Sequence, residues 1–242
     1  NNPGIYGLYA SKSNTEADKA INRDIPRTFP SHPMFARGSD ACLALSNVLR
    51  AYANFNSSVG YCQGMSYIIA TLLMHLNEET AFWVFVEITK RYDVVKIFHD
   101  ETPACLENFK YCLQKIAPKL SAYLEELEIN IEIFVGGWLR TLFTQQFETE
   151  LVFRLLDIFF VEGMDFLIKI ALSMLFYSKE TLLNTTPSNV VIVVNKLPEQ
   201  KWDTDQLIEH SCKIDLKKIE NYTINPPRSR KMMMIPDSPQ IV

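Results

Sequence analysis

Apolar side chains recur at steps of three and four residues along most of this chain. That spacing places them on one face of an α-helix, which repeats every ~3.6 residues. The pattern predicts amphipathic helices over residues 39–55, 106–116, 120–127 and 147–158. In the first of them the apolar positions are Leu45, Val48, Leu49, Tyr52 and Phe55.

Two shorter signals extend the helical pattern. Asn77 precedes Glu78 and Glu79, an order typical of a helix N-cap followed by acidic residues at the positive end of the helix dipole. The run from Val190 to Val194 has the composition of a strand, but its helical surroundings favour a helix there as well.

Together these elements predict an all-α fold of roughly ten or more helices. We expect residues 1–224 to form the helical domain. A soft division into two packed lobes is expected near residues 118–130, where Pro118 interrupts the apolar repeat. Residues 225–242 contain four prolines and predict an irregular C-terminal tail.

The composition is that of a folded protein. With 48% hydrophobic and 12% aromatic residues, the chain can bury a core and differs from a disordered segment. A formal charge of −4 argues against a general nucleic-acid binder. The chain opens on a polar stretch and has no apolar run of ~20 residues, so we expect a cytoplasmic protein without a signal peptide or transmembrane segment.

Cysteines and histidines show no spacing typical of a metal site. The five cysteines form no CxxC pair, and the four histidines show no HxxxH or HExxH spacing. An odd number of cysteines without a framework spacing indicates free thiols in a reducing compartment. The sequence also has no GxSxG elbow and no GxxxxGK[ST] loop, so nothing in it supports an autonomous hydrolase.

The first segment with candidate chemistry surrounds Arg27. Pro26 and Pro30 restrict the backbone around it, and a long cation on a stiff segment suits a side chain presented to a partner. Asp24 can accept hydrogen bonds from the guanidinium or from neighbouring backbone amides. A structural ion pair at a helix end is the alternative interpretation of these residues.

The second segment surrounds Gln63. Gly60 and Gly64 flank it, and glycines permit unusual dihedral angles and the close approach of another backbone. A glutamine amide both donates and accepts hydrogen bonds, as the orientation of a water molecule requires. A buried glutamine that satisfies its own backbone is the alternative interpretation.

The chain is long enough between these segments for Arg27 and Gln63 to meet. A helix over 39–55 is ~25 Å long at about 1.5 Å per residue. The proline-containing stretch 28–38 is not expected to be helical, and when extended it spans up to ~36 Å. It can therefore run back along the helix that follows it.

These segments resemble the two signature motifs of the TBC domain, the Rab GTPase-activating family. Ile21, Asp24 and Arg27 match its IxxDxxR motif, and Tyr61 and Gln63 match its YxQ motif. The resemblance extends over residues 15–200. It fails at the start of the chain, where the basic residue and tryptophan-containing helix usual in the family are not visible.

The resemblance implies a two-lobed GTPase activator rather than an enzyme with an active site of its own. It implies that Arg27 stabilises charge on the phosphates of a GTP-bound Rab and that Gln63 orients the attacking water. Asp24 then holds Arg27, while Tyr61 and Gly64 shape the loop of Gln63. GTP and Mg²⁺ belong to the partner, so the chain needs no cofactor or metal.

The resemblance also sets expectations about partners. We expect a monomer that acts in vesicle trafficking and is recruited to endomembranes through its Rab. Phe29 and Phe35 are candidate exposed contacts with the partner. The alternative function is a Rab-binding scaffold or effector that does not accelerate hydrolysis. Exposure of Arg27 and Gln63 favours the activator, whereas a buried Arg27 pair or an inward Gln63 favours the scaffold.

Overall fold

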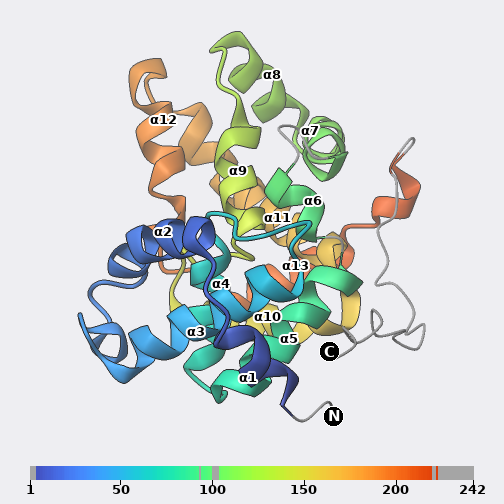
Figure 1. The fold of residues 1–242 in the computed structure, drawn as a ribbon. Helices are drawn as coiled ribbons and strands as arrows, with labels where there is room; N and C mark the ends of the chain where they lie inside the picture. Colours follow the sequence, from blue (N-terminus) through green and yellow to red (C-terminus); the bar gives the residue numbers. More distant parts are fainter. Residues whose placement is uncertain (1–3, 93, 100–103, 220–221, 223–242) are drawn as a thin grey trace.

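The computed structural model describes residues 4–92, 94–99, 104–219 and 222, and Figure 1 shows their arrangement. These residues form 13 α-helices and no strand. The predicted all-α class and number of helices are therefore confirmed. The tail predicted over 225–242 lies outside the described residues.

The helices follow one another with short connections. The α-helices are α1 Ile5–Ala10, α2 Thr15–Asp24, α3 Asp40–Phe55, α4 Met65–Leu73, α5 Glu78–Arg91, α6 Val94–His99, α7 Ala104–Ile116, α8 Pro118–Glu126, α9 Ile131–Arg140, α10 Thr149–Glu162, α11 Met164–Leu183, α12 Pro187–Asn195 and α13 Thr204–Lys213. The short 3-10 helices are η1 Ile25–Arg27, η2 Pro33–Phe35, η3 Leu197–Glu199 and η4 Leu216–Lys218. Both candidate segments lie in connections, the first directly after α2 and the second directly before α4.

Helix α3 is the centre of a first group of helices. Helices α1, α2, α4 and α5 pack against it. The Ser39 hydroxyl caps its N-terminus by accepting a hydrogen bond from the Cys42 backbone N–H at 3.2 Å. Four of its five predicted apolar positions are buried, and Phe55 is half-buried with its ring against Phe82. The predicted helix and its inward face are confirmed.

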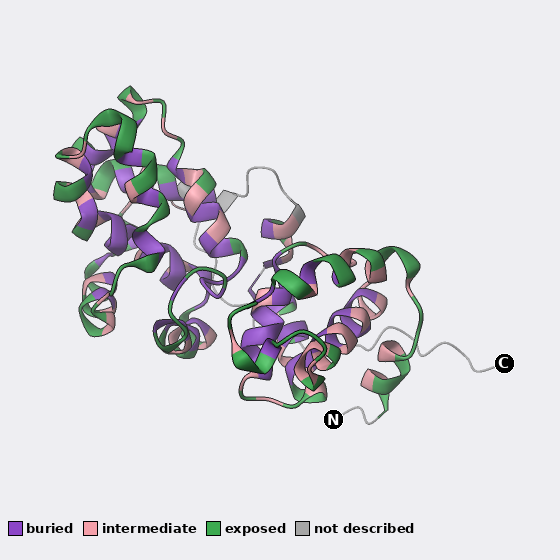
Figure 2. Cartoon of the chain, turned by 90° about the vertical axis from the view of Figure 1, so that its left-hand side faces the viewer, coloured by how far each residue is buried: buried purple, intermediate pink, exposed green. Residues whose placement is uncertain are grey.

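Helix α11 is the centre of a second group. Its 20 residues contact α7, α8, α9, α10, α12 and α13. Helix α6 joins the groups, because it packs against both α5 and α9. A hydrogen bond from the Tyr92 hydroxyl to the Phe160 carbonyl oxygen, at 2.7 Å, ties the end of α5 to α10. Figure 2 shows buried residues along the inner faces of the helices in both groups.

The soft division predicted near residues 118–130 falls on the segment that begins with α8, and it stays a prediction. Pro118 is the first residue of α8, where its fixed φ and missing N–H suit a helix start. Helix α8 then packs against α7 and α11, so it belongs to the second group. The change from one group to the other lies at α6.

Two smaller predictions hold. The Asn77 side chain accepts a hydrogen bond from the Thr80 backbone N–H at 2.9 Å and caps α5. The segment with strand-like composition lies in α12, where Val190 and Val194 are buried four residues apart on one helical face. The preference for helix over strand in that segment is therefore confirmed.

Candidate functional site

The segment around Arg27 is folded onto the end of α2 and anchored to α4. Pro26 lies inside η1, and Arg27 is the last residue of that turn. The buried Thr28 hydroxyl lies 2.9 Å from the Asp24 carbonyl oxygen and 2.8 Å from the Ser66 hydroxyl. These hydrogen bonds fix the backbone from which Arg27 extends.

Asp24 joins the two candidate segments. The residue is only 2% exposed. Arg27 Nε donates a hydrogen bond to Asp24 Oδ1 at 3.1 Å, and Nη2 lies 2.8 Å from the same oxygen. The Tyr61 hydroxyl donates to Asp24 Oδ2 at 2.5 Å. One buried carboxylate thus binds both motifs and holds the two segments together.

The ion pair directs Arg27 without burying it. The Arg27 side chain is 47% exposed, whereas that of Asp24 is 3% exposed. A pair that is open to water on one side contributes little to stability. Its effect is to hold one edge of the guanidinium and leave the outer edge accessible to another molecule.

Tyr61 is held as a hydrogen-bond donor. Burial raises the pKa of its phenol well above the ordinary value, and the hydrogen bond to Asp24 and the charge of that carboxylate raise it further. The hydroxyl therefore keeps its proton at neutral pH and donates it to Asp24.

Gln63 lies in the turn that leads into α4, and its side chain is exposed. Gly60 and Gly64 on either side have φ values of +65° and +105°. A Cβ on Gly64 would also lie 3.4 Å from Thr141 Cγ2. Glycine at position 64 thus serves both the backbone angle and the close approach to the second group of helices.

Tyr67 and Gln145 belong to the site but carry no motif in the sequence. The Tyr67 hydroxyl donates to the Arg27 carbonyl oxygen at 3.0 Å, and its ring packs edge-on against Phe29 with centroids 5.4 Å apart. Burial raises the pKa of Tyr67, whereas the charge of Arg27 and a hydrogen bond with the Gln145 side chain lower it. Gln145 follows α9, so both groups of helices contact the Arg27 segment.

Phe35 is not the exposed partner contact that we predicted. The residue is 4% exposed, because η2 turns its ring inward to lie 6.0 Å from the Phe29 ring. Phe29 is half-buried with φ +48°, an uncommon angle for a bulky residue. Its ring contacts help to hold that conformation, and its contact with a partner stays a prediction.

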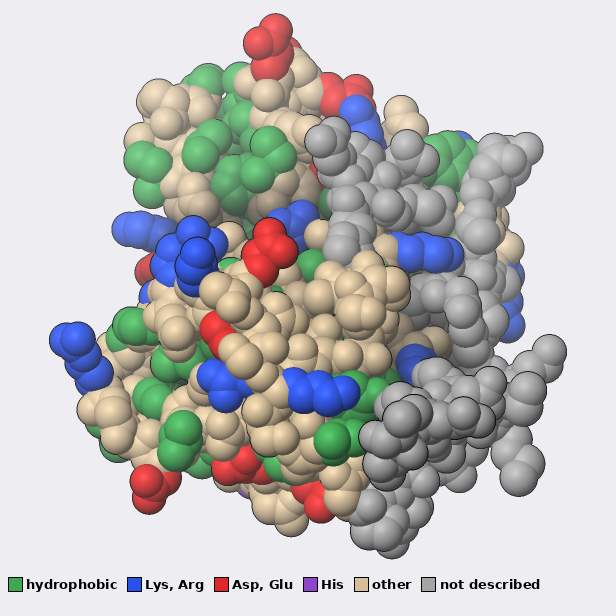
Figure 3. Space-filling view, in the orientation of Figure 1, with side chains coloured by type: hydrophobic (Ala, Val, Ile, Leu, Met, Phe, Trp, Pro, Cys, Tyr) green, Lys and Arg blue, Asp and Glu red, His purple; other side chains and the backbone are tan. Residues whose placement is uncertain are grey.

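The surface around the first segment is basic. Figure 3 shows Lys and Arg side chains gathered over the region of α2, and Lys19 and Arg23 of α2 and Arg27 of η1 are exposed. Asp24 lies buried beneath them. This face suits an anionic group of a partner even though the formal charge of the chain is −4.

The comparison with known families decides how this geometry is classified. The sequence model of the Rab-GTPase-TBC domain family matches residues 4–183, which contain both candidate segments. The chain belongs to this family. The matching residues run from α1 to the end of α11 and include every contact described above between the Arg27 and Gln63 segments.

Curated proteins also resemble this TBC domain. It is 34% identical over 185 residues to the Rab GTPase-activating protein tbc-11 of Caenorhabditis elegans, with 74% of this chain and 19% of that protein covered. It is 33% identical over 176 residues to the Ecotropic viral integration site 5 ortholog of Drosophila melanogaster, with 71% of this chain and 22% of that protein covered. The chain thus spans about a fifth of the length of these relatives.

Solved structures share the fold of this TBC domain. The crystal structure of the Chlamydomonas flagellar RabGAP TBC domain superposes with a TM-score of 0.78 at 25% identity, covering 87% of this chain and 72% of the other. The Ypt/Rab-GAP domain of Gyp1p gives a TM-score of 0.72 at 14% identity, covering 86% and 76%. The second likeness concerns the fold alone.

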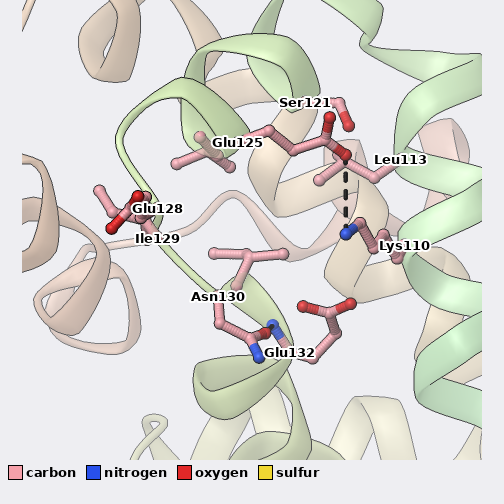
Figure 4. A pocket seen from close by; sticks show the side chains of 10 residues that line it. Lys110, Leu113, Ser121, Glu125, Glu128, Ile129, Asn130 and Glu132 are labelled. Atoms are coloured by element: carbon pink, nitrogen blue, oxygen red, sulfur yellow. Dashed lines mark hydrogen bonds and ion pairs between the residues drawn. The ribbon is translucent and has the colours of Figure 1, made fainter.

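A pocket of about 270 Å³ lies elsewhere in the TBC domain, between α7, α8 and the start of α9. Figure 4 shows Glu125 facing Lys110 in it, with the ion pair at 3.7 Å and Glu128 lying apart. Glu125 and Glu128 are exposed, so these carboxylates belong to a solvated surface.

Among the described residues no cluster of three or more His, Cys, Asp or Glu side chains is arranged to hold a metal ion. None of the described helices has the length and apolarity that a bilayer span requires.

Proposed function

We propose that this TBC domain accelerates GTP hydrolysis by a Rab-family small GTPase in its GTP-bound state. Arg27 and Gln63 act as two fingers that enter the nucleotide site of the partner. The observation that carries the proposal is that both side chains are exposed on adjoining segments, which one buried carboxylate, Asp24, joins. The name of the relative tbc-11, a Rab GTPase-activating protein, supports the same activity.

Arg27 supplies positive charge where negative charge develops. Asp24 engages Nε and Nη2, so the guanidinium is oriented before the partner arrives and Nη1 is left for a phosphate oxygen. An arginine finger is typically worth ~10³–10⁵ in rate, or about 4–7 kcal/mol of barrier. The held guanidinium loses little rotational freedom on docking, because its fork is already aligned.

Gln63 orients the attacking water in place of the glutamine of the GTPase. Its amide oxygen accepts a hydrogen bond from the water, and its NH₂ group donates to a neighbouring oxygen. Gly60 and Gly64 set the turn on which it stands, and Tyr61 fixes that turn to Asp24. GTP and Mg²⁺ are carried by the partner.

Exposure of the fingers favours the activator over the scaffold. A Rab-binding scaffold needs neither an accessible arginine nor an accessible glutamine. It would be favoured by an Arg27–Asp24 pair in which Arg27 is buried. The Arg27 side chain is 47% exposed and Gln63 is exposed as well. A scaffold remains the runner-up and is an outcome of the experiment.

Single-turnover GTP hydrolysis by a panel of Rabs, with and without this chain, tests the proposal. We expect strong stimulation of one or a few Rabs, and a loss of about 10³-fold or more with Arg27→Ala. Stable binding to a GTP-loaded Rab without stimulation would establish the scaffold instead.

Arg23→Ala is the matched control. Arg23 lies four residues from Arg27, its side chain is 77% exposed, and its Nε is 3.9 Å from the same Asp24 oxygen. If general positive charge on α2 were sufficient, both variants would lose activity alike. The proposal predicts that Arg23→Ala keeps nearly all of the stimulation.

A further inference from the structure

Arg140 lies beside the loop of Gln63 and comes from the second group of helices. It is the last residue of α9 and is exposed. A Cβ on Gly64 would lie 3.7 Å from Arg140 Cγ, so the aliphatic part of the arginine covers the residue directly after Gln63. In Figure 1 the connection that leads into α4 crosses α9.

The charge of Arg140 also reaches the residue before Gln63. Burial raises the pKa of the Cys62 thiol, and the positive charge of Arg140 lowers it. Contacts or charge from Arg140 therefore act on both sequence neighbours of Gln63. In the part of the chain that the structure describes, the Arg140 guanidinium has no ion-pair partner.

The backbone at the end of α9 is held firmly. Thr141 Oγ1 donates to the Gly137 carbonyl oxygen at 3.0 Å. Leu142 and Phe143 follow with φ values of +49° and +66°, and both are fully buried. Consecutive non-glycine residues with left-handed backbone angles persist only where tight packing around them holds that conformation. Arg140 is therefore presented from a fixed point.

Arg27 and Arg140 differ in how their charge is compensated. Arg27 has a carboxylate partner within the chain, Asp24, before any partner docks. Arg50 and Arg154 are also paired, at 2.6 Å from Asp18 and 2.7 Å from Asp205, whereas Arg37 and Arg91 resemble Arg140 in having no ion pair among the described residues. Arg140 thus places a guanidinium without an ion-pair partner among the described residues beside the loop of Gln63.

We propose that Arg140 binds a carboxylate of the docked GTPase, next to the point at which Gln63 enters, and so determines which GTPases are accepted. The inference rests on the proposed function, because it concerns the same face. A guanidinium forms bidentate hydrogen bonds with a carboxylate. Charge pairs outside the reacting centre act on affinity and partner choice rather than on the chemical step.

Arg140→Met and Arg140→Lys form the test pair. Methionine keeps an unbranched stem against Gly64 and removes the charge, whereas lysine keeps both the stem and the charge. Single-turnover rates are measured against increasing concentrations of the chain, with the Rab that responds most strongly. We expect Arg140→Met to raise KM about tenfold with kcat within twofold, and Arg140→Lys to restore most of the affinity.

The source of the anion is tested by charge reversal. Arg140→Glu is combined in turn with Lys substitutions of the surface carboxylates of the GTPase, and one combination is expected to recover KM. The effect of Arg140→Met on KM should also shrink between low and high salt, since salt screens exposed charges. Arg154→Ala, an exposed arginine of α10, is the control and should leave KM unchanged.

Three results would overturn the inference. One is an unchanged KM with Arg140→Met and Arg140→Glu. Another is a lower kcat at constant KM, which would place Arg140 on the phosphates. The third is a failure of every charge-reversed GTPase to recover KM. All three presuppose stimulation by the unaltered chain, so they are distinct from failure of the proposed function, in which no Rab is stimulated at all.

Discussion

At the scale of single residues, Asp24 is the buried charged group of the site, and its carboxylate needs hydrogen-bond donors around it. Its buried carboxylate has an exposed arginine on one oxygen and the half-buried phenol of Tyr61 on the other. A buried charge is costly unless donors surround it. Arg27 and Tyr61 supply those donors, so the carboxylate that orients Arg27 also holds the loop of Gln63.

Tyr61→Phe should therefore weaken both fold and activity. It leaves Asp24 Oδ2 without the phenol donor, and we expect the free energy of unfolding to fall by about 1–3 kcal/mol, as for a hydrogen bond to a charged group. We also expect stimulation of the Rab to fall at least several-fold at a temperature where the variant is folded. Urea denaturation and single-turnover hydrolysis measure the two effects.

Tyr123→Phe separates these effects. The Tyr123 hydroxyl donates to the Thr185 carbonyl oxygen at 3.0 Å, within the second group of helices. Its loss should lower stability somewhat and leave stimulation intact. Equal loss of stimulation in both variants would show that stability alone explains the result for Tyr61.

Arg27→Lys should behave like Arg27→Ala. An ammonium group keeps the charge but cannot engage Asp24 through a planar fork while it reaches a phosphate oxygen. We expect stimulation to fall by about 100-fold or more, because a displaced cation loses most of the ~10³–10⁵ that an arginine finger supplies. The measurement is single-turnover hydrolysis, and a lysine variant with near-native activity would mean that charge alone is needed.

At this scale the sequence predicts part of the site. Proline and glycine positions and the IxxDxxR and YxQ motifs mark Asp24, Arg27, Tyr61 and Gln63, because stiff or unusual backbone has a local signature. Tyr67 has no such signature, since its bond to the Arg27 carbonyl oxygen depends on tertiary packing. The inward ring of Phe35 was missed because a short turn decides it.

At the scale of elements, the turn into α4 depends on its two glycines in different ways. Gly60 has φ +65° and open space around a Cβ, whereas Gly64 has φ +105° and Thr141 Cγ2 at 3.4 Å. A side chain at position 60 would be destabilised only by the left-handed backbone angle. A side chain at Gly64 meets a less favourable angle as well as a neighbour.

Gly60→Ala and Gly64→Ala form a matched pair. We expect Gly60→Ala to lower the free energy of unfolding by about 1 kcal/mol and Gly64→Ala by about 2 kcal/mol or more. Stimulation should fall further in Gly64→Ala, because a backbone that moves to accommodate the new Cβ also moves the adjacent Gln63. Thermal or urea denaturation checks the order, and equal losses would mean that the contact with Thr141 is unimportant.

Elements themselves were largely predictable from the sequence. Period and capping residues predict the helix from Ser39 to Phe55 and the start of α5 at Asn77, since both signals are local. The predicted soft division near residues 118–130 depends on Pro118, and a proline that ends one apolar repeat can equally begin the next helix. Only the packing of α8 on α7 and α11 distinguishes the two.

At the scale of the whole molecule, the site is built by both groups of helices. The first group carries Arg27 and Gln63, and the second contacts their segments through Arg140, Thr141 and Gln145. Residues about 80 positions apart in the sequence are in contact here. Neither hydrophobic periodicity nor a local motif predicts such a long-range contact. The Arg27 and Gln63 segments are therefore held from two sides.

The central claim is that Gln63 orients the attacking water from outside the GTPase. The most direct test is single-turnover hydrolysis by a responsive Rab whose own water-orienting glutamine is replaced by alanine. We predict that the unaltered chain still stimulates this Rab strongly and that Gln63→Ala does not, while Gln206→Ala on α13 behaves like the unaltered chain. If the chain stimulates the native Rab but not its alanine variant, the water is oriented by the GTPase, and the role of Gln63 as a finger is contradicted.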